Sequence, residues 1–529
     1  MKRKSEYKPL LYTTTVRNPR RVKGLLNILK NFNGEILTNE LAQDIMGKLI
    51  YYGLYRPMKK TSSVKAKWKS TRSGKFSDTI LSEPEVKIIL DDNPQNHKEA
   101  GFNKGWSSRF ATIFNFTKEL GFVYFWQNKK IEFSKVGLKL AESIEVTVRE
   151  DSILVSDIHP EFEQQAFLHA LAKSQRNNPF LRVLNENIPL ILLLKTIKKL
   201  NADKKFNSTG ISKLELPLII FWKDNNAEDL YQLIKSIREK YQYKPSWEVI
   251  IDTCENTIMK GKFKEFQPKS IMNEYPDDFI RKMRLTGLIS LRGGGRFIDI
   301  NKNELEKIDY VLEKYSQYKK YSTAREYFDY MAQVDQNLIS FIPKATDIET
   351  NNKYLINWTK HYSFTDIKKE LMILSSRGKS KDGVLKYLPH PVRLEFLVSI
   401  AIKHKFPNIK VMPNYPCDDE GIPTSTAGGQ GNQGDIECFD GNNGILVEVT
   451  MSEGRQQTMM EVWPIARHLE EFSKKIEKSL CCFIAPSIFK DSERQIKFSK
   501  QEYNLSIHPK TINNFLEYIS TSKDFYCDN

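Results

Sequence analysis

One stretch decides how the carboxyl-terminal part of the chain folds: GGQGNQGDIECFDGNNGILVEVTMSEGRQQTMMEVWPIAR, residues Gly428–Arg467. Two short runs in it, DIECF and ILVEVT, are rich in residues that favour β-strands, and they flank DGNNG. Glycine and asparagine tolerate the positive φ of a tight turn, so the pattern predicts a hairpin. A fold about Asn442 places Asp435 opposite Glu448 or an immediate neighbour, about 5 Å away.

Acidic residues recur at one interval along this stretch. Asp435 heads the first run, Glu448 lies in the second, and the same spacing again leads to Glu461, expected on the following helix. Carboxylates held close together repel one another unless a cation or a shared proton offsets the charge. Mg²⁺ takes oxygen ligands and keeps several waters, which leaves room for a phosphate oxygen and an attacking hydroxide. Three solvated acids in an ordinary α/β domain remain the alternative.

The alternation of side chains along a strand predicts which residues face the core. Thr450 should point to the same side as Glu448, while Val447 and Val449 should point into a core. A hairpin lying on the surface would not need buried valines. We therefore expect the two runs to be part of a packed sheet.

The order acid, hairpin, E-V-T and helix resembles the PD-(D/E)xK nuclease fold. The words GNQGD and VEVT, with FIAP at residues 483–486, resemble more closely the AlwI family of type IIS restriction endonucleases and their nicking relatives. The downstream helix with Glu461 and the pair Arg467-His468 belongs to the same resemblance, as does TTTVRNP near the amino terminus. The general fold has a lysine where this chain has Thr450.

The resemblance implies a type II site-specific deoxyribonuclease that uses Mg²⁺. Asp435, Glu448 and Glu461 would be its metal ligands, and Glu395, in HPVRLEFLVSIAIKH, would be a fourth catalytic acid. Without the lysine, a metal-bound water and Glu461 are expected to share its role. The pair at residues 467–468 would position a phosphate or pack against the core.

Composition limits the class of protein. At 529 residues the chain is too long for one ordinary core. Its net charge of +16 favours a polyanionic partner such as double-stranded DNA, although a merely basic soluble protein is an alternative. No apolar run approaches the ~20 residues that span a bilayer, and no secretory signal follows Met1, so we expect a cytoplasmic protein without membrane contact. The six cysteines form neither a disulfide framework nor a zinc half-site.

The amino-terminal part contains candidates for DNA contact. RPMKKTSSVKAKWKSTRSGK, residues 56–75, has eight Lys or Arg and no acid, which suits contact with phosphates, although a solvated basic loop is the alternative. Residues 105–143 and 279–304 each read as a helix followed by a β-hairpin, the order of a winged helix. The residues expected to contact DNA are Lys59, Lys60, Lys65, Lys67, Lys69, Arg72, Ser107, Ser108, Arg109, Arg292 and Arg296.

We therefore predict a multidomain α/β protein. Residues 1–155 form a DNA-recognition subdomain with a winged helix, and residues 156–307 form a second winged-helix-like subdomain. Residues 308–384 form a helical linker, with an exposed joint at SSRGKSKDG, and residues 385–529 form the PD-(D/E)xK-like nuclease domain. A spacer between recognition and chemistry makes cleavage at a fixed offset geometrically possible.

The predicted function is that of a Mg²⁺-dependent type IIS restriction endonuclease, which binds a short asymmetric duplex sequence and hydrolyses phosphodiester bonds at a fixed distance outside it. One site cuts one strand at a time, so double-strand cleavage requires a transient homodimer or a second nuclease subunit. A strand-specific nicking endonuclease or the large subunit of a heterodimeric enzyme is an alternative. A winged-helix DNA-binding regulator with an inactive nuclease-like domain is another. The resemblance also implies a cognate DNA methyltransferase.

Overall fold

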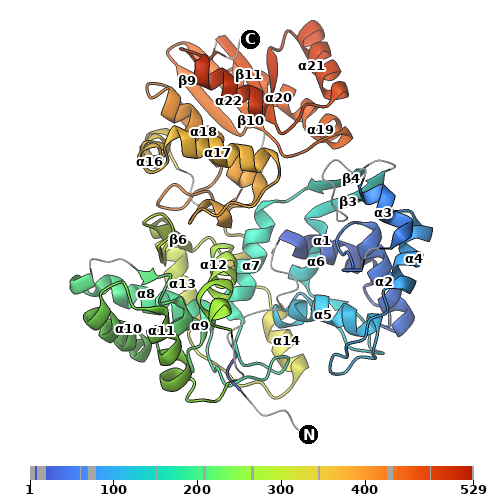
Figure 1. The fold of residues 1–529 in the computed structure, drawn as a ribbon, viewed down its shortest axis with the longest axis vertical. Coiled ribbons are helices and arrows are strands. Elements are labelled where there is room, and N and C mark those ends of the chain that lie inside the picture. The colour runs from blue at the N-terminus through green and yellow to red at the C-terminus, as the bar shows by residue number, and fades with distance from the viewer. Residues whose placement is uncertain are drawn as a thin grey trace. The chain divides into compact units, whose positions relative to one another are not determined.

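The computed structural model describes most of the chain, and it divides into two compact units (Figure 1). The first unit comprises Met1–Thr286 and Glu306–Phe341, and the second comprises Gly287–Leu305 and Ile342–Asn529. The chain therefore passes between the units three times. The described residues are 6–8, 20–59, 61–69, 79–149, 152–206, 210–263, 267–343, 346–425, 433–476 and 478–526.

The first unit is mainly helical. Its strands β1 to β4 pair in short antiparallel hairpins, β1 with β2 and β3 with β4. The elements are α1 (Arg20–Leu29), α2 (Asn39–Tyr51), α3 (Ser62–Lys69), α4 (Glu83–Asp92), α5 (Trp106–Glu119), β1 (Val123–Tyr124), β2 (Glu132–Phe133), α6 (Lys135–Glu142), β3 (Ile144–Arg149), β4 (Ser152–Asp157), α7 (Glu161–Lys173), α8 (Pro189–Ala202), β5 (Ile211–Ser212), α9 (Leu216–Ile220), α10 (Ala227–Tyr241), α11 (Trp247–Asp252), α12 (Tyr275–Arg284), α13 (Leu305–Tyr315), α14 (Ala324–Ala332) and α15 (Gln336–Ile339).

The amino-terminal segment carries apolar residues at the spacing of an amphipathic helix. Leu25, Ile28 and Leu29 are buried in α1, and α2 follows after a short connection. The predicted order of helix, hairpin and helix is also present in residues 105–143, as α5, β1, β2 and α6. The two strands of this hairpin are only two residues long each.

The second unit is built on a five-stranded mixed sheet with the order β12-β11-β10-β9-β8. β8 to β10 are antiparallel, whereas β11 runs parallel to both β10 and β12. The elements are β6 (Ile289–Arg292), β7 (Phe297–Ile300), α16 (Ile348–His361), α17 (Phe364–Ser375), α18 (His390–Lys405), β8 (Lys410–Pro413), β9 (Ile436–Asp440), β10 (Asn443–Val449), α19 (Arg455–Met460), α20 (Val462–Ser473), β11 (Lys478–Ala485), α21 (Lys490–Tyr503), β12 (Ile507–Thr511) and α22 (Ile512–Thr521).

Helices cover both faces of this sheet (Figure 1). On one face, Leu446 of β10 joins a core with Ile465, Leu469 and Phe472 of α20. On the other, Val447 is fully buried, and α18 and α22 pack against the strands. A central strand covered on both sides carries apolar residues at consecutive positions, which explains the unbroken run ILV before Glu448.

The central hairpin confirms the prediction made from DGNNG. β9 and β10 pair antiparallel through a two-residue connection, Gly441-Asn442, with Asp440 opposite Asn443. Two details differ from the prediction. Val449 at the end of β10 is only half-buried. Glu461 is not inside a helix but at the junction between α19 and α20, with φ −113°.

The predicted linker, residues 308–384, is divided between the two units. So is the predicted second helix and hairpin, residues 279–304. Residues 308–341 belong to the first unit and residues 342–384 to the second. α12 and the β6–β7 hairpin follow one another as expected, but α12 belongs to the first unit and the hairpin to the second.

The cysteines that the structure describes are free thiols buried in the two units, as expected for reduced packing residues. Cys527 lies outside the described residues. Among the helices in the described ranges, none has the length and apolar character needed to cross a membrane.

Candidate active site

Asp435, directly before β9, and Glu448, in β10, face each other across the β9–β10 hairpin. β10 residue Val447 pairs with Ile436, and one further step along the same register brings Glu448 opposite Asp435. The two carboxyl groups are close enough to hydrogen-bond to each other. Burial, and then the charge of Glu448, raises the pKa of Asp435 well above its ordinary value.

Two backbone N–H groups hold Asp435, and a side-chain amide holds the residue before it. Asp435 Oδ2 accepts a hydrogen bond from the N–H of Val449 at 2.8 Å. Its carbonyl oxygen accepts from the N–H of Asn414 at 2.9 Å, and the Asn414 side-chain amide donates to the carbonyl of Gly434 at 2.7 Å. A Cβ atom at Gly434 would lie 2.5 Å from Oε1 of Glu448, so only glycine leaves space for that carboxylate.

The third acid, Glu461, is held by hydroxyl groups. Its Oε1 accepts hydrogen bonds from Thr450 Oγ1 at 2.8 Å and from Ser452 Oγ at 2.7 Å. Burial raises the pKa of both Asp435 and Glu448, and the charge of Glu461 contributes to both shifts. Thr450, at the position where the general nuclease pattern has lysine, therefore orients Glu461.

Glu395 and His468 approach Glu448 from two helices. Glu395 on α18 is buried. The pKa of Glu448 is raised well above its ordinary value by the burial of Glu448 itself, then by the charge of Glu461, and also by the charge of Glu395. His468 on α20 places Nδ1 2.9 Å from Glu448 Oε1. Burial, followed by the charge of exposed Arg467, lowers the pKa of His468, so the neutral imidazole can donate from Nδ1 to the carboxylate.

The carboxylate cluster has the donor chemistry of a site for a hard divalent cation. Within the residues that the structure describes, no group of three or more His, Cys, Asp or Glu side chains has the geometry of a formed metal site. Asp435, Glu448 and Glu461 instead accept hydrogen bonds from the protein donors given above. Their mutual repulsion, which raises two pKa values, is what a bound cation would relieve.

The basic run at residues 56–75 is only partly described. Lys65 and Lys67 are exposed on α3, where Lys67 pairs with Glu85 at 2.8 Å. Lys59 is exposed and donates to the carbonyl of Asp92 at 3.0 Å. Lys60, Arg72 and the side chain of Lys69 lie outside the described residues.

The residues at the start of α5 are bonded inside the fold. Ser107 and Ser108 are buried, and Ser108 Oγ donates to the carbonyl of Asn103 at 2.8 Å. Ser107 donates to the side chain of Gln127. Arg109 is half-buried, with Nε donating to the Gln95 side chain at 2.8 Å.

Arg292 and Arg296 lie in different environments on the same hairpin. The Arg292 side chain is only 15% exposed and forms ion pairs with three carboxylates, those of Asp299, Asp419 and Glu420. Arg296, in the turn, is exposed. The sequence could not separate the two, because the acids that bind Arg292 lie mostly far from it in the chain.

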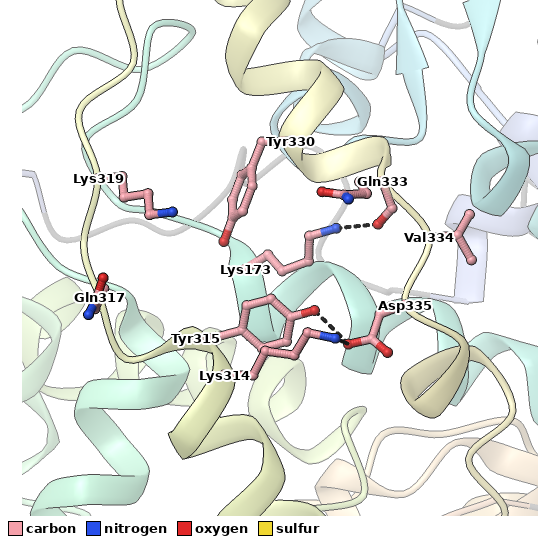
Figure 2. Close-up of a pocket in the computed structure, with 9 residues that line it drawn as sticks. All are labelled: Lys173, Lys314, Tyr315, Gln317, Lys319, Tyr330, Gln333, Val334 and Asp335. Carbon is pink, nitrogen blue, oxygen red and sulfur yellow. Dashed lines mark hydrogen bonds and ion pairs between the residues drawn. The ribbon is translucent and has the colours of Figure 1, made fainter.

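A pocket of about 210 Å³ lies in the first unit, apart from the acids (Figure 2). Lys173 Nζ donates there to the carbonyls of Met331, at 2.9 Å, and Gln333, at 2.7 Å, at the carboxyl-terminal end of α14. Burial lowers the pKa of Lys173 to about 7. Tyr315 and Lys314 donate to Asp335, so these polar groups stabilise the fold around the pocket. It is lined by Lys173, Lys314, Tyr315, Gln317, Lys319, Tyr330, Gln333, Val334 and Asp335.

Sequence reasoning missed three residues that shape the acid cluster. Asn414 and Gly434 fix the strand that carries Asp435, and Ser452 holds Glu461. The glycine directly before Asp435 was a usable signal, because a small residue beside a predicted acid often permits close approach. Asn414 and Ser452 had none.

Comparison with solved structures gives distant similarity to restriction endonucleases. The small subunit R.BspD6I2 of the heterodimeric restriction endonuclease R.BspD6I has 24% identity over 30% of this chain and 78% of its own, with a TM-score of 0.26. FokI has 11% identity over 98% of this chain and 96% of its own, also with a TM-score of 0.26. FokI bound to DNA has 12% identity over 98% and 95%, with a TM-score of 0.22. A comparison with curated protein sequences finds no match.

The class of protein follows from the sequence family. The family described as AlwI restriction endonuclease matches residues 118–380 and 370–518, which together cover well over half of the chain and include all four acids of the cluster. The protein is thus a restriction endonuclease, a site-specific deoxyribonuclease. It belongs to the AlwI restriction endonuclease family.

Proposed function

We propose that the protein is a type IIS enzyme, which binds a short asymmetric duplex sequence and cuts at a fixed distance outside it. The carboxylate cluster of Asp435, Glu448, Glu461 and Glu395 is the proposed catalytic site. The observation that carries this assignment is the placement of Asp435 opposite Glu448, with Glu461 and Glu395 close enough to raise the pKa of Glu448.

In the proposed reaction, the cluster would hold Mg²⁺ through Asp435 and Glu448, with Glu461 as the third ligand. When bound, the ion supplies the positive charge that activates a water molecule and neutralises charge developing on the scissile phosphate. Other side chains of the protein orient the catalytic acids and contact the phosphate. His468 orients Glu448, Thr450 orients Glu461, and exposed Arg467 is placed on α20 to contact a phosphate.

We assign DNA recognition to the amino-terminal part of the chain. The helix–hairpin order of α5, β1 and β2 supports a winged helix there, within the proposed recognition subdomain 1–155. Exposed lysines on and near α3 support contact with phosphates. The proposed contacts are Lys59, Lys65, Lys67, Arg109 and Arg296, together with Lys60, Lys69 and Arg72, whose side chains are not described. Ser107 and Ser108 are left out because they are buried, and Arg292 because three carboxylates enclose it, whereas Arg109 is only half-buried.

One catalytic cluster per chain requires a partner for double-strand cleavage. A second nuclease domain, from another copy or from a small subunit, would pack against the second unit. Exposed aromatic side chains of α20 and α21 support such a contact, because Trp463, Phe498 and Tyr503 lie together with ring centroids 6.2–6.5 Å apart. If the chain instead nicks one strand, supercoiled plasmid should stop at the open-circle form.

Substitution of Glu448 tests the catalytic assignment. Glu448→Gln keeps the volume of the side chain but removes the charge, so cleavage should be lost while DNA affinity stays near the wild-type value. Arg494→Gln, on the exposed surface of α21, is the matched control for folding and handling. Unchanged cleavage by Glu448→Gln would refute the assignment of the carboxylate cluster as the catalytic site.

A cognate methyltransferase is the expected companion. A restriction enzyme that cuts short duplex sequences would damage its host unless those sequences were modified. Methylated and unmethylated host DNA should therefore differ as substrates of the purified protein. Equal cleavage of both would argue against a protective modification at the recognised sequence.

A further inference from the structure

Within the second unit, Arg292 of the β6–β7 hairpin makes several directed contacts. Arg292 Nε donates to Asp299 Oδ2 at 2.7 Å, and Nη2 donates to Asp419 Oδ2 at 2.7 Å and to the carbonyl of Ile300 at 3.0 Å. Nη1 donates to Glu420. Charge-assisted bonds of a guanidinium to several carboxylates are among the strongest and most directional in proteins. The hairpin therefore has a defined position against residues 419–420.

Neighbouring contacts reinforce the same junction. Ser290 Oγ donates to Asp419 Oδ1 at 2.6 Å, and the N–H of Asp419 donates to Asn301 Oδ1 at 3.2 Å. A Cβ at Gly295 would lie 2.3 Å from the carbonyl oxygen of Gly383, so only glycine permits this approach of the two backbones. The junction is therefore specific in both charge and shape.

The loop that Arg292 holds leads directly to the proposed active site. Loop 414–425 follows β8, and its tip carries the two acids that bind Arg292. At its start, Asn414 hydrogen-bonds to the carbonyl groups of Gly434 and Asp435. The position of the Asp435 backbone is therefore set by a residue of the same loop.

We propose that Arg292 is a positioning residue for DNA cleavage, which holds loop 414–425 and, through Asn414, the backbone of Asp435. This inference rests on the proposed active site. The hairpin that carries Arg292 is continuous with the first unit at both ends, at Thr286–Gly287 and at Leu305–Glu306. The hairpin that makes these contacts is thus joined covalently to the first unit at both of its ends.

The test uses the full-length protein at a temperature well below its unfolding transition. Arg292→Gln should lower the single-turnover cleavage rate by about 10–100-fold, the loss expected when a reacting group is displaced by about 1 Å. Its affinity for DNA, measured without divalent metal, should equal that of the wild type. Lys302→Gln removes the same charge from an exposed site next to the hairpin and should cut at the wild-type rate.

A second comparison separates positioning from a general loss of stability. If Arg292 acts through the loop, Asn414→Ala should lower the rate similarly, and the double variant should be no slower than the slower single variant. Losses that multiply in the double variant, or a wild-type rate in folded Arg292→Gln, would overturn the proposal. Asp419→Asn serves as the test if Arg292→Gln does not fold. Asp435→Asn distinguishes the two assignments, because its full activity would instead refute the active site itself.

Discussion

The Nδ1 atom of His468 lies 2.9 Å from Oε1 of Glu448, on the face of β10 that packs against α20. This hydrogen bond joins β10, the central strand of the sheet, to α20, the helix that begins directly after Glu461. It aligns a buried carboxylate whose pKa is raised by burial and then by its acidic neighbours. Conservative substitutions of His468 or Glu448 should therefore lower the cleavage rate before they lower the stability of the fold.

Replacement of His468 should separate orientation from bulk. His468→Ala removes the donor to Glu448 and should lower the single-turnover cleavage rate by about 10–100-fold. His468→Asn keeps an N–H donor near the position of Nδ1 and should lose less. Quenched-flow cleavage of a labelled duplex measures both rates. Equal rates for the two variants would show that the hydrogen bond does not matter.

Thr450 offers a test of how Glu461 is oriented. Thr450→Val keeps the shape but removes the hydroxyl that donates to Glu461 Oε1 at 2.8 Å. We expect cleavage to slow by about 10–100-fold, because loss of a hydrogen bond to a charged group corresponds to roughly 1.5–3 kcal/mol. Thr450→Ser keeps the donor and is the control. Wild-type cleavage by the valine variant would leave Ser452 as the sole support of Glu461.

Gly434 should tolerate no side chain. In Gly434→Ala the added Cβ would lie 2.4 Å from Leu446 Cδ1 and 2.5 Å from Glu448 Oε1. The free energy of unfolding should fall by about 1–3 kcal/mol, as for overpacking in other cores, and cleavage should fall with it. Chemical denaturation gives the first quantity. Gly441→Asn, in the exposed turn between β9 and β10, meets no atom within 4 Å but has φ +58°, so it should lower the free energy of unfolding only slightly and leave cleavage unchanged.

Lys173 should make stability depend on pH. Its pKa is about 7 in the folded protein, against an ordinary value of 10.5, so the unfolded chain binds the extra proton between these values. The contribution of Lys173 to stability should therefore rise as the pH increases from 7 to 10. Thermal unfolding of the wild type and of Lys173→Met at several pH values measures the difference. A difference that stays constant across this range would contradict the lowered pKa.

The sequence was most informative where local chemistry determines structure. A two-residue turn at Gly441-Asn442 sets the register of its own strands, so the opposition of Asp435 and Glu448 followed from the turn. The break at Glu461 was less accessible. Pro464 lies in the first turn of α20, where proline is tolerated, but the regular spacing of the acids suggested that Glu461 would lie within a helix.

Contacts between distant parts of the chain could not be predicted in this way. Asn414 reaches Gly434 through a side-chain bond that no local pattern encodes. Arg292 reads as a surface cation because only one of its three acidic partners, Asp299, is near it in sequence. The distinction between a cation that faces solvent and one that is enclosed by acids depends on tertiary packing.

The three crossings of the chain between its units limit how the enzyme can be divided. A catalytic fragment taken from residue 385 onward would contain the acid cluster but omit β6 and β7. In such a fragment, Asp419 and Glu420 would lose their arginine partner. A chimaeric nuclease made from this protein would therefore need residues 287–305, which carry the β6–β7 hairpin, in addition to the nuclease domain.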